Sequence, residues 1–266
     1  MREVKVQPSV GVWDSGVGGL TVLAALRRAL PGVPMHYLAD SAHAPYGERA
    51  DAFILERSLA LTDHLIARGA RLIVIACNTA TAVAADALRV RHPGVPIVGI
   101  EPGIKPAVAA SRTGRVGVLA TTATVNSPRF ARLLARHAAD ARITSVACSG
   151  VVKHIEAGDV DSAALRALIH RYCEPLRQNA VDTALLGCTH YPLIRPLWEA
   201  ELGPGVQLIQ VEAAVAQQAA RLWAGTMPPE EVGGLRLSST GDPGVLAQVA
   251  RQGLGWLDVQ PTHERI

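Results

Sequence analysis

Long apolar runs are missing from this sequence. Residues 72–76 form a typical hydrophobic stretch, whereas a helix that crosses a bilayer needs about 20 consecutive apolar residues. Residues 1–5 also lack the apolar core and the small-residue cleavage site of a signal peptide. We therefore expect a protein that has no membrane contact and works in the cytoplasm.

Cysteine is scarce as well, and no two cysteines form a Cys-x-x-Cys pair. The four are Cys77, Cys148, Cys173 and Cys188, and in a chain without a leader we expect reduced thiols rather than a disulfide framework. Cys188 and His190 together would supply only two zinc ligands, and the other histidines show no matching spacing. The sequence thus predicts no metal site.

Lysine occurs only at positions 5, 105 and 153, and none lies in a recognisable context for pyridoxal phosphate. Nucleotide motifs are incomplete too. The turn at residues 14–19 reads Asp-Ser-Gly-Val-Gly-Gly, but the third glycine of a G-x-G-x-x-G motif would fall on Thr21, and a P-loop is absent. We expect no cofactor; the glycines instead let backbone N–H groups approach a small anion.

The charges nearly balance, with 26 basic and 23 acidic residues and a net charge of +3. Nucleic-acid binding usually needs a broad basic surface. The densest basic group, Arg129, Arg132 and Arg136, has the helical spacing of a solvated helix face. We therefore expect no nucleic-acid partner.

Short apolar, β-branched runs alternate with longer stretches rich in alanine, leucine and arginine. The expected strands are residues 10–13, 36–39, 72–76, 97–100, 116–120, 143–147, 184–186 and 206–211. Helical periodicity is clear at residues 20–30, 52–68 and 81–91. This alternation predicts an α/β fold with doubly wound, mostly parallel sheets.

A weak internal repeat divides the chain in two. The run 11–14 is similar to the run 117–120, and each half later carries a strand that ends in a cysteine followed by polar residues, at Cys77 and at Cys188. The interval from Asp14 to Cys77 is close to that from Thr121 to Cys188. Because ligands bind at the carboxyl ends of strands in open α/β sheets, each half would bring one thiol to a binding site.

The residues beside these two cysteines suit acid–base chemistry. N–H groups at a helix start can bind a carboxylate and lower a thiol's pKa from about 8.5 towards neutrality. Asp14 is either a proton acceptor for Cys77 or a cap on the glycine-rich turn. His190 could stabilise the Cys188 thiolate or exchange a proton with it. Cys148 and Cys173 lack such neighbours and are interpreted as packing residues, although Cys148 follows an expected strand and could line a cleft.

Four motifs in this order resemble the glutamate racemases: DSGVGGLTV at 14–22, PYG at 45–47, ACNTAT at 76–81 and LGCTHYP at 186–192. The likeness covers essentially the whole chain. It implies two pseudo-symmetric α/β domains, residues 1–97 plus 210–266 and residues 98–209, with the active site at their interface. It also implies L- and D-glutamate as substrates and no cofactor.

The resemblance implies a role for each matching residue. Cys77 would be the base for D-glutamate, assisted by Asp14, and Cys188 the base for L-glutamate, assisted by His190. Glu156 would help to orient the histidine. The substrate-binding positions would be Asp14, Ser15, Tyr46, Gly47, Cys77, Asn78, Thr79, Thr121, Thr124, Cys188, Thr189 and His190. The segment Thr122-Ala123 lies where family sequences vary.

The same resemblance implies a homodimer that supplies D-glutamate for peptidoglycan synthesis. Three alternatives stay open. A racemase of another acidic amino acid, such as aspartate, would use the same two thiols. A one-cysteine relative that decarboxylates or isomerises is disfavoured, because both cysteine clusters are present. Some glutamate racemases inhibit DNA gyrase, so a second role as a gyrase-binding protein is the third.

Overall fold

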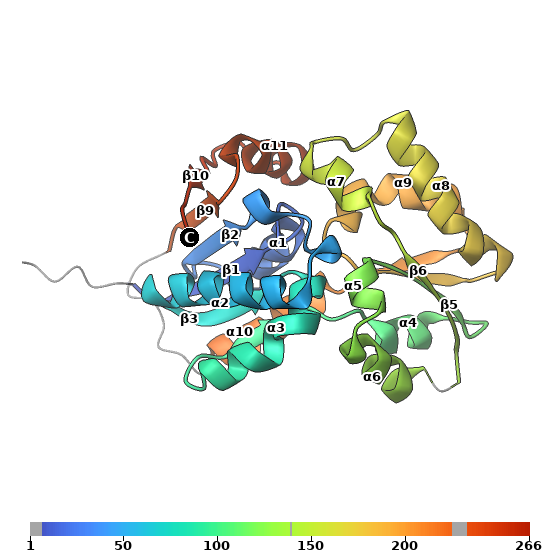
Figure 1. The fold of residues 1–266 in the computed structure, drawn as a ribbon, viewed down its shortest axis with the longest axis horizontal. Helices are drawn as coiled ribbons and strands as arrows, with labels where there is room; N and C mark the ends of the chain where they lie inside the picture. The colour runs from blue at the N-terminus through green and yellow to red at the C-terminus, as the bar shows by residue number, and fades with distance from the viewer. Residues whose placement is uncertain (1–6, 139, 225–232) are drawn as a thin grey trace, which may run out of the picture.

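The computed structural model describes residues 7–138, 140–224 and 233–266. Residues 1–5, to which the expectation about a signal peptide applies, lie outside these ranges. Within them the strands form two parallel sheets, each flanked by helices, that lie side by side (Figure 1). No helix in the described ranges is long and apolar enough to cross a membrane.

In the described residues, the first sheet has the strand order β10–β9–β2–β1–β3–β4 and the second the order β6–β5–β7–β8. The first sheet comprises β1 (Ser9–Asp14), β2 (Met35–Ala39), β3 (Ala70–Ile75), β4 (Ile97–Gly99), β9 (Leu235–Ser239) and β10 (Thr262–His263). The second comprises β5 (Arg115–Ala120), β6 (Arg142–Ala147), β7 (Thr183–Leu186) and β8 (Gln207–Ile209).

Helices connect the strands and cover the sheets. The α-helices are α1 (Leu20–Ala29), α2 (Asp51–Ala67), α3 (Asn78–Arg91), α4 (Ile104–Ala110), α5 (Thr122–Val125), α6 (Pro128–His137), α7 (Val151–Glu156), α8 (Ala163–Gln178), α9 (Arg195–Leu202), α10 (Glu212–Trp223) and α11 (Pro243–Leu254). Short 3₁₀ turns are η1 (Ser41–His43), η2 (Tyr46–Glu48) and η3 (Tyr191–Ile194).

The order β2–β1–β3–β4 in the first sheet recurs as β6–β5–β7–β8 in the second. All these pairings are parallel. The expected α/β fold with two similar parallel sheets is therefore confirmed. In this correspondence β1 matches β5 and β3 matches β7, so the two cysteines follow equivalent strands.

The sequence prediction missed the edge of the first sheet. β9 and β10 were not expected, because their sequences carry serine, threonine, arginine and histidine and lack a long apolar run. β9 becomes a strand by pairing along its length with the buried β2. The expected strand 206–211 is shorter than predicted, since β8 ends at Ile209 and buried Val211 precedes α10.

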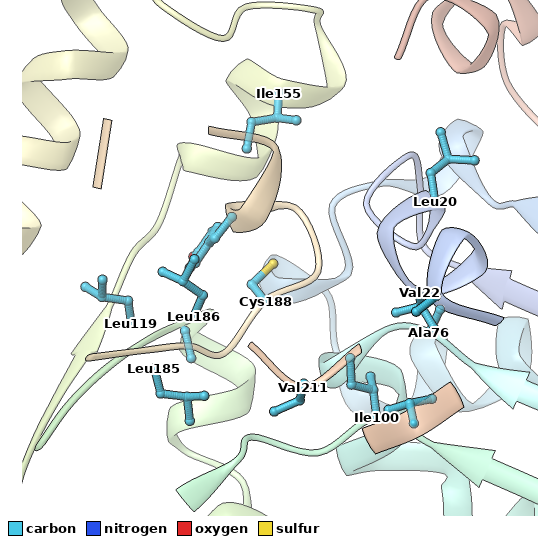
Figure 2. Close-up of a cluster of buried hydrophobic side chains, with 14 of the residues drawn as sticks. Leu20, Val22, Ala76, Ile100, Leu119, Ile155, Leu185, Leu186, Cys188 and Val211 are labelled. Carbon is cyan, nitrogen blue, oxygen red and sulfur yellow. The ribbon is translucent and has the colours of Figure 1, made fainter. Parts of the chain in front are cut away.

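After β8 the chain returns to the first sheet. α10 packs against α1 and against β3 and β4 (Figure 1). One buried hydrophobic cluster consequently includes residues from both sheets and from the helices that cover them. Figure 2 shows Cys188 inside it, with labelled side chains from both halves around the thiol: Leu20, Val22, Ala76, Ile100, Leu119, Ile155, Leu185, Leu186 and Val211. Cys188 thus lies at an apolar junction of the two sheets.

The two central strands each carry a glycine where a helix approaches closely. A β-carbon on Gly11 of β1 would lie 3.1 Å from Cβ of Leu65 in α2 and 2.9 Å from Cδ1 of Ile73. A β-carbon on Gly117 of β5 would lie 2.5 Å from Cδ2 of Leu176 in α8. In both equivalent strands, the absence of a side chain at one position therefore lets a helix pack closely against the sheet.

Gly11→Ala and Gly117→Ala should each lower the free energy of unfolding by about 1–3 kcal/mol, because an added methyl group overpacks a filled core. Urea or thermal unfolding measures the change. Gly94→Ala is the matched control, since a β-carbon there meets nothing within 4 Å, and its effect should stay within about 0.5 kcal/mol. Equal stability of all three variants would contradict the close packing.

Candidate active site

A small buried cavity lies where the carboxyl ends of the two sheets meet. The empty space inside it, including the part open to solvent, is about 260 Å³. The residues that line it are Ser15, Pro45, Tyr46, Gly47, Cys77, Asn78, Thr79, Thr121, Val152, Cys188, Thr189 and His190.

Most residues singled out in the sequence therefore come together around one space. Asp14, Thr124 and Glu156 do not line the cavity and instead bond to residues that do. Pro45 and Val152 line it but were not expected there. Both are apolar and offer no chemical signal, although Pro45 lies inside the PYG motif at 45–47.

Cys77 follows β3 and caps the N-terminus of α3. Its sulfur accepts a hydrogen bond from the Ala80 N–H at 3.4 Å and lies 3.6 Å from the Ser15 hydroxyl oxygen. Burial raises the pKa of this thiol to about 12, and the negative charge of Asp14 adds to the shift. The expected lowering of this pKa is therefore wrong for the empty site: desolvation outweighs the helix N-terminus.

Asp14 ends β1 and is completely buried. Its carboxylate accepts hydrogen bonds from the Gly16 N–H at 2.8 Å and from the Thr189 hydroxyl at 3.1 Å. Burial raises the pKa of Asp14 to about 6, against the opposing effect of the nearby His190. Asp14 therefore caps the glycine-rich turn, as one of its two expected roles requires. Its role as a proton acceptor for Cys77 stays a prediction.

On the other side, Cys188, His190 and Glu156 form a chain of contacts. The Cys188 sulfur is 3.8 Å from Nδ1 of His190, and Nε2 of the same ring bonds to the Glu156 carboxylate. Burial opposes protonation of His190, but the contacts with Cys188 and Glu156 raise its pKa well above the usual value. At neutral pH an imidazolium therefore faces the Cys188 sulfur.

Three threonine hydroxyls connect the two halves beside the cavity. Thr79 of α3 bonds to Thr121 at 2.9 Å, and Thr121 donates to Thr124 at 3.0 Å. Next to them, the buried amide of Asn78 has no hydrogen-bond partner for its oxygen or its nitrogen among the described residues. An unpaired buried amide is costly, so the lining is prepared for a polar ligand.

The hydroxyl of Tyr46 does not serve the cavity. It donates to Asp40 at 2.5 Å, and Arg57 donates to both oxygens of the same carboxylate. Burial opposes ionisation of Asp40, yet the hydrogen bonds from Arg57 and Tyr46 hold its pKa below the usual value. The sequence reading missed Asp40, although its position directly after β2 was a signal that could have found it.

The remaining cysteines are buried. Burial raises the pKa of Cys173 to about 12, and that of Cys148 is raised as well. Cys148 also lines a second small cavity, which shares Pro45, Gly47, Thr121 and Val152 with the first. The described residues contain no group of three or more histidine, cysteine or acidic side chains that could hold a metal ion.

The raised pKa of Asp14 makes stability depend on pH. Its folded value of about 6 exceeds the ordinary 3.8, so its contribution is fully present below pH 3.8 and is lost as pH rises through 6. The unfolding free energy of the wild type relative to Asp14→Asn should fall by about 2 kcal/mol between pH 4 and pH 7, since part of the contribution is already lost at pH 4.

Chemical denaturation at several pH values tests this expectation. Asp182→Asn is the control with the opposite sign, because hydrogen bonds from Ser111, Thr113 and Arg112 outweigh burial and lower the pKa of Asp182 to about 2. That contribution is present above pH 3.8 and is lost as pH falls through 2. A flat difference for Asp14→Asn would mean that its carboxyl titrates normally.

The comparisons with known proteins agree with this geometry. The sequence profile of the Asp/Glu/Hydantoin racemase family matches residues 18–219. The glutamate racemase of Ectopseudomonas mendocina is 52% identical over 216 residues, which cover 81% of this chain and 82% of that protein.

Solved structures show the same relationship. The crystal structure of the Escherichia coli glutamate racemase, in complex with L-glutamate and the activator UDP-MurNAc-Ala, matches with a TM-score of 0.86 at 32% identity over 97% of both chains. The Francisella tularensis enzyme in complex with D-glutamate gives 0.83 at 27% identity, also over 97% of both chains. The chain belongs to the Asp/Glu/hydantoin racemase family.

Proposed function

We propose that this protein interconverts L- and D-glutamate without a cofactor, by proton transfer between the substrate α-carbon and two thiols. The observation that carries the proposal is the arrangement of Cys77 and Cys188. They follow equivalent strands of two similar sheets and line the same buried cavity. Inversion of a carbon centre needs a base on one face and an acid on the other, and two thiols from two lobes provide this.

Glutamate as the substrate is supported by the relatives and by the lining. The relatives at about half identity carry that activity in their names. The cavity offers the Asn78 amide and the hydroxyls of Thr79 and Thr189, groups that can bind carboxylates. Donors aimed at the α-carboxylate would stabilise the charge that develops when the α-proton leaves.

The two sides of the cavity differ in charge, which suits one base and one acid. With a pKa of about 12, Cys77 is a protonated thiol at neutral pH. Cys188 lies beside the cationic His190. In this proposal, the Cys188 sulfur takes the α-proton of L-glutamate, and the Cys77 thiol donates its proton to the opposite face. D-glutamate reacts by the reverse transfers.

After L-glutamate has been converted to D-glutamate, the protonation states of the two thiols are exchanged. Cys77 is then a thiolate and Cys188 a thiol, so the protein is set for D-glutamate until protons exchange. The Ala80 N–H and the Ser15 hydroxyl are the groups that stabilise the Cys77 thiolate. Asp14, ionised above pH 6, can receive a proton from that side. We assign Glu156 to hold His190 in orientation and charge.

We further propose that the two sheets belong to two domains, residues 1–97 plus 210–266 and residues 98–209, which separate to admit substrate. Most side chains that line the cavity are buried, and hydrogen bonds such as Thr79–Thr121 join its two sides. In this proposal D-glutamate supplies cytoplasmic peptidoglycan synthesis. The homodimer stays a prediction, and sedimentation velocity would test it.

Purified protein without added cofactor should racemise both enantiomers. Cys77→Ala and Cys188→Ala should each lower kcat/KM by roughly 10²–10⁴-fold, the contribution typical of one acid–base group. Because the enantiomers are equally stable in water, the loss must be equal in both directions. Circular dichroism at a single wavelength follows the reaction. Cys173→Ala is the matched control, a buried thiol outside the cavity, and should keep wild-type kcat.

Hydrogen exchange in D₂O assigns each thiol to a face. Cys188→Ala retains the proposed base for D-glutamate and should incorporate deuterium at Cα of D-glutamate without inversion. Cys77→Ala should do so with L-glutamate. The reverse pattern would exchange the two assignments, and near-wild-type racemisation by either variant would refute the two-base mechanism.

Substrate choice is tested in the same assay. Glutamate should have the highest kcat/KM among glutamate, aspartate and a few neutral amino acids. A higher value for aspartate would keep the mechanism and reject the substrate. Full loss of activity on dialysis against a chelator would instead favour a metal-dependent reaction.

A further inference from the structure

The glycine-rich turn after β1 contacts the groups that serve Cys77. It begins at Asp14, whose carboxylate accepts the Gly16 N–H at 2.8 Å. The next side chain, Ser15, lies 3.6 Å from the Cys77 sulfur. The backbone of this turn therefore sets the positions of Ser15, which contacts the first thiol, and of Asp14, whose charge acts on it.

The same turn contacts the groups that serve Cys188. The Val17 N–H donates to Glu156 at 2.7 Å, and Glu156 holds His190. A β-carbon on Gly18 would lie 2.4 Å from Nδ1 of His190, and one on Gly16 would overlap the Glu156 carboxylate. The turn thus packs its bare backbone against the second acid–base pair, and a shift of the turn would move both sides of the cavity.

A buried tyrosine holds this turn from within the first sheet. Tyr37 lies in β2, beside Val12 of β1, and is completely buried. Its hydroxyl donates to the Gly16 carbonyl at 2.6 Å. Burial, with the negative charges of Asp14 and Glu156, holds the pKa of Tyr37 well above its ordinary value. The hydroxyl therefore remains a donor throughout the working pH range.

We propose that Tyr37 is a positioning residue for the reaction: its hydroxyl fixes the turn at residues 15–19 and thereby aligns the acid–base groups of both thiols. This inference rests on the proposed racemisation and names a residue that the reaction steps do not use. A phenylalanine would fill the same core space. The hydroxyl adds a buried polar group whose bond is made to the turn itself.

A second tether acts at the other end of the turn. The Thr21 hydroxyl donates to the Gly18 carbonyl at 3.0 Å, and the Thr21 N–H reaches the same oxygen at 3.2 Å. Because that N–H remains when the hydroxyl is removed, this tether is partly redundant. Tyr37 should therefore matter more than Thr21.

Tyr37→Phe tests the proposal with the loss of one oxygen atom. We expect kcat to fall about 10-fold, because small misplacement of reacting groups is costly, while KM changes less than about two-fold. The primary isotope effect with α-deuterated glutamate should stay fully expressed. Tyr172→Phe is the matched control: its hydroxyl also donates to a backbone carbonyl, that of Ser149, at 2.7 Å. It should lower thermal stability to a similar extent and leave kcat unchanged.

The outcomes separate this inference from the proposed function. If the wild type does not racemise glutamate, the function is wrong; if it does and Tyr37→Phe keeps wild-type kcat, or loses only stability or only KM, the positioning role is wrong. Should Tyr37→Phe show no cooperative unfolding transition, Thr21→Val decides. We expect about a three-fold lower kcat with unchanged KM, since one of two bonds to Gly18 is lost, and wild-type kcat would overturn the proposal.

Discussion

The carboxyl ends of four parallel strands, β1, β3, β5 and β7, face one another across one small cavity, and every other feature of the site depends on this arrangement. Parallel strands place the residues that follow them at the same edge of a sheet. Two sheets with the same strand order therefore present two matching sets of side chains. Residues at equivalent positions, such as Cys77 and Cys188, arrive from opposite lobes with no need for a long active-site loop.

The same arrangement buries the site, and burial controls the pKa values of its acid–base groups. Asp14 and the Cys77 thiol are both buried, and their pKa values rise because the charged forms lose solvation. His190 is equally buried but becomes cationic, because Cys188 and Glu156 favour its charged form. Two lobes with the same topology thus carry unlike charges. The Cys77 thiol therefore lies near a buried carboxyl group, whereas the Cys188 thiol lies beside a cationic imidazole.

Hydrogen bonds across the junction give the closed cavity its shape. Thr189 of one half donates to Asp14 of the other, and Val17 of the first half donates to Glu156 of the second. Each bond ends on a group to which the proposed function assigns a role in proton transfer. The alignment of these groups therefore depends on contacts between the two halves.

Local pattern in the sequence determined much of this protein. The apolar runs located the central strands of both sheets, and the polar clusters after two of these strands located both thiols. These features could be predicted because periodicity and strand ends depend on residues that are adjacent in the sequence. The resemblance to the glutamate racemases extended this to Glu156 and to the threonines. Tertiary structure alone decided the rest. β9 and β10 form by pairing in the first sheet, where β9 pairs with the distant β2. The Tyr46 hydroxyl donates to Asp40. Burial raised the pKa of Cys77 where a helix start alone would lower it, because desolvation depends on everything packed around the thiol and no local pattern records it.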